Sequence, residues 1–144
     1  MSGLAALLAG HTPTDVYRWH SALPVADVQH AVEHAGWSFR HLDGWTVEDR
    51  DAFLKELGAA LGLAQCPADL DEMAATVSGL TADGKGTVLL WEGWSPLARH
   101  DEGGFAAAVA ALASRARDEE ADRFAVVLRG EGPDLDLEEL PHKH

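Results

Sequence analysis

Carboxylates are the side chains most able to do chemistry in this sequence, and one stretch gathers them without basic neighbours. No Lys or Arg occurs between positions 55 and 85. The acidic residues of that interval are Glu56, Asp69, Asp71, Glu72 and Asp83. Carboxylates without nearby cations attract basic protein surfaces. The stretch therefore indicates either a site for a positively charged partner or an acidic, solvated surface.

Phosphate-binding and metal-binding patterns are weak. Segment 79–86 (GLTADGKG) resembles a phosphate-binding loop only in its glycines and lysine, because Gly86 stands where the magnesium-binding hydroxyl belongs. The segment also precedes an expected strand, whereas such a loop follows one. His30 and His34 would share a helix face, yet a zinc site needs further ligands that no nearby cluster supplies. We expect no cofactor and no metal.

Nucleophilic catalysis has one candidate. Cys66 precedes an expected helix start, where the helix dipole favours a thiolate, and His41 or His100 would have to approach it as the base. No local signature supports this arrangement. Asp69 and Asp71 are two residues apart and would point to different sides of a helix, so they do not suggest glycoside chemistry. We expect no catalytic residue.

Charge narrows the class of partner. The 24 acidic and 11 basic residues of the 144-residue chain give a formal net charge of −13, which disfavours nucleic acid and anionic membranes and favours a basic partner. Cys66 is the single cysteine and cannot form an internal disulfide. The first ten residues lack the features of a signal peptide or membrane span. We expect a cytoplasmic protein that is monomeric when free.

The elements that would position these residues begin with a βαβ unit. Two dense apolar runs, 88–91 (VLLW) and 124–128 (FAVVL), are typical of strands buried on both faces. Between them, an alanine-rich helix is expected, capped by Asp101. Its buried stripe would be Phe105, Val109, Leu112 and Ala116. Parallel strands therefore form the expected core.

The rest of the chain also alternates between expected strands and expected helices. We expect strands at 16–19 and 37–42, a helix opened by Pro24, and a helix capped by Thr46. Pro67 is expected to start a short helix whose polar side carries the acids. The buried stripe of that helix would be Leu70, Met73, Val77 and Leu80. The order βαβααβαβ predicts one α/β domain, residues 1–130.

The C-terminal segment differs in composition. Residues 131–144 (EGPDLDLEELPHKH) are acidic and contain proline, so we expect a largely disordered tail. Leu135, Leu137 and Leu140 are the residues that would dock on the domain if the tail folded back.

Residues 37–130 resemble the barstar family, especially its longer members from high-GC bacteria. The resemblance rests on the order and spacing of short motifs: Leu42-Asp43-Gly44, the helix with Phe53 to Leu61, Leu70-Asp71 with Met73, the run 88–91 followed by Trp94, and the final strand 124–130.

This resemblance implies a fold, a partner and a site. Barstar-like proteins are intracellular inhibitors without catalytic activity, in which an acidic helix and its preceding loop block the basic active site of a secreted ribonuclease. The implied fold is a parallel sheet of three strands packed with helices, here with an extra N-terminal strand. The implied partner-binding residues are Asp69, Asp71, Glu72 and Gly79.

The sequence departs from the family pattern at two anchor positions. Ala74 stands where the family carries an aromatic residue, and Ala75 where it carries its most deeply inserted aspartate. The two alanines have three possible explanations. The contact with the ribonuclease is rebuilt from Asp69, Asp71 and Glu72, the protein binds a different basic partner, or it has lost the inhibitory function. A binding module of another kind would use exposed aromatic residues, for which Trp45 and Trp94 are candidates because both follow strand ends.

Overall fold

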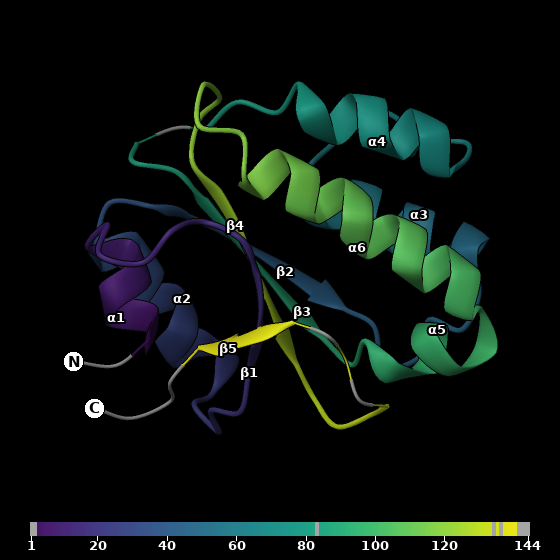
Figure 1. Ribbon diagram of the computed structural model, residues 1–144, viewed down its shortest axis with the longest axis horizontal. Coiled ribbons are helices and arrows are strands. Elements are labelled where there is room, and N and C mark those ends of the chain that lie inside the picture. The colour runs from purple at the N-terminus through teal and green to yellow at the C-terminus, as the bar shows by residue number, and fades with distance from the viewer. Residues whose placement is uncertain (1–2, 83, 134, 136, 141–144) are drawn as a thin grey trace.

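The computed structural model describes residues 3–82, 84–133, 135 and 137–140, and its centre is an all-parallel sheet (Figure 1). The strands lie in the order β2-β3-β4-β1-β5. They are β1 (Val16–Trp19), β2 (Ser38–Asp43), β3 (Thr87–Glu92), β4 (Phe124–Arg129) and β5 (Glu138–Leu140). In the central register, Leu90 pairs with His41 on β2 and with Val127 on β4. The predicted α/β class with a parallel sheet and an extra N-terminal strand is confirmed.

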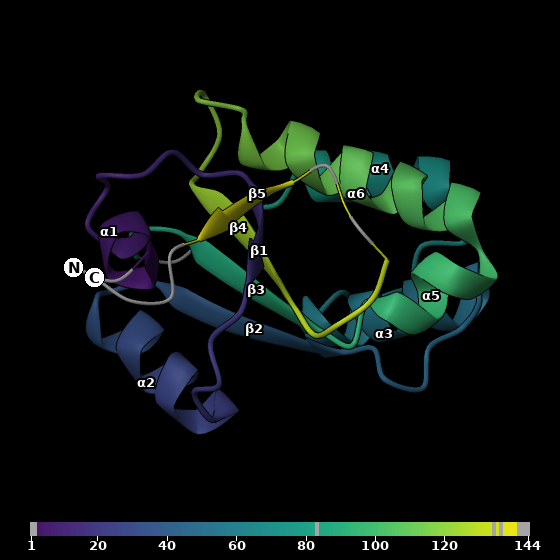
Figure 2. The same ribbon diagram turned by 60° about the horizontal axis from the view of Figure 1, so that its bottom comes forward.

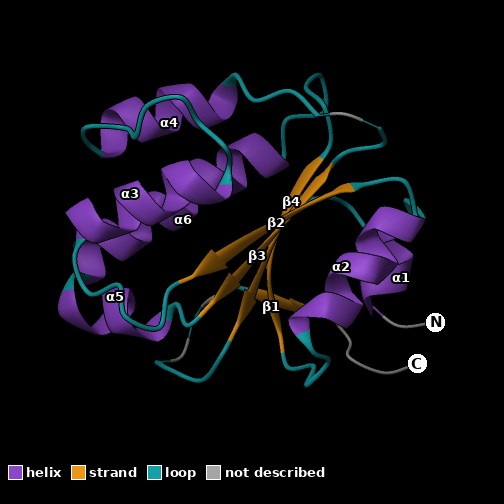
Figure 3. Cartoon of the chain, turned by 180° about the vertical axis from the view of Figure 1, so that it is seen from behind, coloured by secondary structure: helices purple, strands orange, loops and turns teal. Residues whose placement is uncertain are grey.

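Helices cover both faces of the sheet. The described helices are α1 (Gly3–Leu8), α2 (Val25–His34), α3 (Arg50–Ala60), α4 (Leu70–Ser78), α5 (Ser95–His100) and α6 (Glu102–Ala116). Figures 2 and 3 show α1 and α2 on one side of the sheet and the other four helices on the opposite side. Covering both faces is the usual arrangement around parallel strands.

Each dense apolar run serves two cores because successive strand side chains alternate between faces. On β3, Leu89 and Trp91 lie in the core beneath α3, α4, α5 and α6. Val88 and Leu90 lie in the second core, with α1 and α2. The α6 crossover from β3 to β4 is the βαβ unit that the sequence predicts.

Two predicted helix starts are wrong. Asp49, and not Thr46, caps α3, because its carboxylate accepts a hydrogen bond from Ala52 N at 2.8 Å. The helix expected from Pro67 begins only at Leu70. Asp69 in extended backbone caps it and accepts from the Glu72 amide at 2.8 Å. In both cases the true cap satisfies an otherwise orphaned amide in the first turn.

Three short elements differ from the expectations. The sequence does not predict α1 or α5, which are six residues each and too short to show a helical period. The tail was expected to be largely disordered beyond residue 130, yet β5 pairs in parallel with β1. Leu140 is 2% exposed in the core that holds α1 and α2, and Leu135 and Leu137 are partly buried against the other core, so the three leucines named as possible docking residues all pack on the domain.

Candidate protein-interaction site

The predicted acidic helix is present as α4, with its carboxylates at the N-terminal end. Asp71 and Glu72 lie in the first turn and are exposed. Within the part of the chain that the structure describes, neither carboxylate has a hydrogen-bond or ion-pair partner. Negative charge at a helix N-terminus is favoured by the helix dipole, so both side chains are compatible with a stable helix while remaining available to a partner.

Three of the predicted contact residues, Asp71, Glu72 and Gly79, lie on one exposed face of α4. Residues three and four apart are neighbours on a helix surface, which places Ala75 beside both Asp71 and Glu72. Gly79, the C-terminal cap, follows Glu72 by seven residues and is also exposed. The face thus carries carboxylates at one end and only small groups further along, at Ala75 about 5 Å and at Gly79 about 10 Å away by the helical rise. We call Asp71, Glu72, Ala75 and Gly79 the α4 face.

Asp69 has a different position from the other acids. Its carboxylate is exposed but is engaged by the Glu72 amide as the helix cap. A partner would reach only the remaining lone pairs of this carboxylate. Asp69 therefore contributes to the stability of α4 whether or not it also contacts a partner.

The opposite side of α4 fixes the helix to the domain. Met73 and Val77 are fully buried in the core that contains Phe53 of α3 and Leu112 of α6. At the C-terminal end, Arg115 Nη2 of α6 donates a hydrogen bond to the Leu80 carbonyl oxygen at 2.8 Å. A helix held at its apolar side and at one end presents its exposed side chains in a fixed geometry, which lowers the entropy cost of binding.

The side chains that catalysis would require together have separate partners. Cys66 is exposed, and its thiol donates to the Lys55 carbonyl at 3.7 Å. His41 Nε2 lies 3.0 Å from Glu92 Oε1, and His100 Nε2 lies 2.9 Å from a Glu48 carboxylate oxygen. The structure therefore does not bring the thiol and either imidazole into one site.

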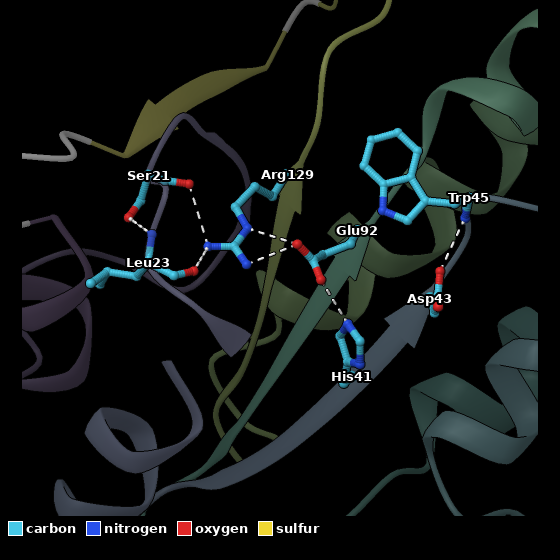
Figure 4. A network of polar contacts seen from close by, with 7 residues as sticks. All are labelled: Ser21, Leu23, His41, Asp43, Trp45, Glu92 and Arg129. Carbon is cyan, nitrogen blue, oxygen red and sulfur yellow. Dashed lines mark hydrogen bonds and ion pairs between the residues drawn. The ribbon is translucent and has the colours of Figure 1, made fainter. Parts of the chain in front are cut away.

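A second polar cluster lies at the carboxyl ends of the strands, where open parallel sheets commonly bind ligands (Figure 4). Glu92 Oε2 at the end of β3 accepts from Nε and Nη2 of Arg129 on β4, at 3.0 and 2.8 Å. Arg129 Nη1 donates to the carbonyl oxygens of Leu23 and Ser21, at 2.6 and 3.3 Å. His41 of β2 completes the cluster through Glu92 Oε1.

This cluster joins three strands and the β1–α2 connection. Burial acts to raise the pKa of Glu92, but the hydrogen bonds and charges of Arg129 and His41 outweigh it and hold that pKa below its ordinary value. The donors of Arg129 are directed at protein acceptors, so the arrangement is structural. Sequence reasoning missed it, although charged residues that directly end dense apolar runs, as Glu92 and Arg129 do, are a usable signal.

The two candidate aromatic anchors differ in exposure. Trp45 is 53% exposed beside the carboxyl ends of the strands, and a Cβ at Gly93 would lie 2.5 Å from its ring, so the glycine lets the indole lie against the backbone. Trp94 is fully buried, which makes the expectation of exposure wrong. It packs 5.6 Å from the Phe105 ring because α5 turns the chain back over the core.

Residues 3–82, 84–133, 135 and 137–140 contain no group of three or more His, Cys, Asp or Glu side chains placed to hold a metal ion. The same part of the chain also contains no helix of the length and hydrophobicity needed to span a bilayer.

The chain is an α/β protein with a parallel sheet covered on both faces and an exposed acidic helix, α4. The family model described as "Barstar (barnase inhibitor)" matches residues 37–129. The protein belongs to the barstar family, as the sequence resemblance indicates. That family is one of inhibitors that act on a protein partner.

Similarity to other proteins concerns the fold alone. The Aeropyrum pernix ORC2 protein, solved as ADPNP and ADP complexes, matches with a TM-score of 0.57 and 12% sequence identity. The match covers 90% of this chain and 38% of the ORC2 chain, so this chain corresponds to well under half of that protein. No match was found among curated protein sequences.

Proposed function

We propose that this protein is an intracellular inhibitor that binds the basic active site of a barnase-like ribonuclease through the α4 face and Asp69. The observation that carries the proposal is the pair of exposed carboxylates, Asp71 and Glu72, which lack cationic partners among the described residues of a rigidly held helix. A ribonuclease active site must bind phosphates with Lys, Arg and His. Carboxylates in the place of phosphates would form charge-assisted hydrogen bonds with the same groups.

The net charge of −13 supports fast association with such a partner. Long-range attraction to a basic protein raises the encounter rate and is weakened by salt. The free thiol of Cys66 fits the reducing cytoplasm, which is where an inhibitor would protect cellular RNA from the ribonuclease. Direct binding of nucleic acid is disfavoured by the same charge.

A second candidate is a protein-interaction module with another basic partner and no ribonuclease inhibition. Ala75 favours this alternative, because the exposed centre of the α4 face carries a methyl group and no charge. The same face would then bind a protein whose contact surface needs no third carboxylate.

Calorimetric titration against a barnase-type ribonuclease, at low and moderate salt, tests the proposal when RNA cleavage is measured in parallel. We expect saturable binding that weakens with salt. The rate of RNA cleavage should fall in proportion to the fraction of ribonuclease that is bound. Binding without inhibition would establish the second candidate. No binding by the folded protein would reject the ribonuclease as partner.

A further inference from the structure

Arg115 of α6 is a buried cation with unused hydrogen-bond donors. It is 3% exposed, and its Nη2 donates to the Leu80 carbonyl. Neither Nε nor Nη1 has a hydrogen-bond partner among the described residues, although both nitrogens are buried. The guanidinium lies over the Phe124 ring at 5.4 Å, which satisfies none of those N–H groups. Buried charges are normally paired, so the missing acceptors point to an absent ligand.

The guanidinium lines a polar pocket at the amino ends of the central strands. The pocket is formed by Ser38 and Arg40 of β2, Thr87 of β3, and Thr81 in the connection after α4, together with Arg115. Among the described residues that line the pocket, none is a carboxylate. Asp122 is near this edge, but its carboxylate accepts from the Ala82 amide at 2.8 Å and does not line the pocket.

Arg40 adds a second cation to the pocket. Its guanidinium is exposed and has no acidic partner in the described part of the chain. Three other arginines do form ion pairs: Arg50 with Asp101, Arg117 with Asp15, and Arg129 with Glu92. Two arginines that line one pocket with no carboxylate among its described lining residues favour an anion there.

The size of the pocket selects the ligand class. Its volume is about 230 Å³. This is below the range of about 300–1,000 Å³ that is typical of pockets for drug-sized ligands. A tetrahedral oxyanion fits this space, and threonine hydroxyls with guanidinium groups are suitable donors for it.

We propose that this pocket, formed by Arg115, Arg40, Thr81 and Thr87, binds a small oxyanion of the phosphate or sulfate type. The bound ion accepts hydrogen bonds from the buried Arg115 and from Arg40 at the rim. The pocket adjoins Leu80 at the C-terminal end of α4, at the far end of that helix from Asp71 and Glu72. The site is therefore separate from the proposed ribonuclease-binding carboxylates.

Titration of the full-length protein with sodium phosphate tests the site, with amide chemical shifts followed at constant ionic strength. We expect saturable shifts at Thr81, Ala82 and Thr87. The R40Q variant should raise the dissociation constant roughly tenfold, since one charge-assisted hydrogen bond is lost. The R99Q variant is the matched control, because Arg99 is an exposed arginine of α5 outside the pocket, and it should leave the constant unchanged.

The alternatives give different results. Adenosine monophosphate added in place of phosphate distinguishes a free ion from the phosphate group of a larger molecule, and equal binding of both would show that the pocket accepts either source. No saturable shift, or equal binding by R40Q and the wild type, would overturn the proposal.

Discussion

Substitution of Ala75 by aspartate is the sharpest test of the α4 face. Ala75 is exposed at the centre of that face, three residues after Glu72 and four after Asp71. The change creates a third carboxylate at the position where the family carries its deeply inserted aspartate. We expect A75D to bind a barnase-type ribonuclease more tightly than the wild type.

The magnitudes follow from the position of Ala75 in the helix. Aspartate is a poorer helix former than alanine by up to about 0.7 kcal/mol. Each like-charge neighbour at helical spacing costs about 0.2–0.5 kcal/mol. With Asp71 and Glu72 as the two like-charge neighbours, the free energy of unfolding should therefore fall by up to about 1.1 to 1.7 kcal/mol. A new charge-assisted hydrogen bond contributes about 1.5–3 kcal/mol to binding, so the dissociation constant should fall by about 10- to 150-fold.

The assay is calorimetric titration at two salt concentrations, with urea unfolding of the free protein. A26D is the matched control, since Ala26 is an exposed residue of α2 on the other side of the sheet and acquires the same charge. Equal tightening in A26D would show a general charge effect. Weaker binding by a folded A75D would refute the assignment of this face or of this partner.

Three further results are expected. D71A/E72A should weaken partner binding at least tenfold without unfolding the protein, since neither carboxylate has a partner among described residues. D69A should lower the free energy of unfolding by about 1 kcal/mol through loss of the α4 cap, whereas D69N keeps a capping side chain and should be near neutral. The Glu92 pKa lies below its ordinary value of about 4.5, so the stability it provides is complete above that pH and is lost as pH falls through the lowered pKa.

Each of these three expectations has a result that would contradict it. Unchanged affinity of D71A/E72A, with native circular dichroism, would remove the carboxylates from the binding model. Equal destabilisation by D69A and D69N in urea would show that charge at this position matters more than the cap. Between neutral pH and about pH 3, the thermal unfolding midpoint should fall less in E92Q than in the wild type. An identical loss in both proteins would contradict the role of Glu92.

Elements with a strong local pattern could be predicted from the sequence. The runs 88–91 and 124–128 are apolar at consecutive positions, and this pattern requires cover on both faces of a strand. Asp101 was correctly predicted as the α6 cap, and its carboxylate accepts from Gly104 N at 3.0 Å. These features depend on neighbours within a few residues, which the sequence displays directly.

The elements that were missed depend on distant contacts. Strand β5 exists because Leu140 is buried and the strand pairs with β1, more than a hundred residues earlier. The competition between Thr46 and Asp49 as the α3 cap was also decided by tertiary position, since Val47 between them is buried in the core. A local rule permits either cap, but packing fixes where the helix begins.

The sequence alone determined the fold class, the family resemblance and the acidic stretch without basic residues. Those properties follow from composition and from periodicities that local chain geometry imposes. Only the tertiary structure decided that Asp71 and Glu72 are exposed, that His41 and Arg129 both contact Glu92, and that Arg115 is buried with two nitrogens that have no acceptor among the described residues. Pairing and burial join residues far apart in the chain, so they are set by how the helices and strands pack.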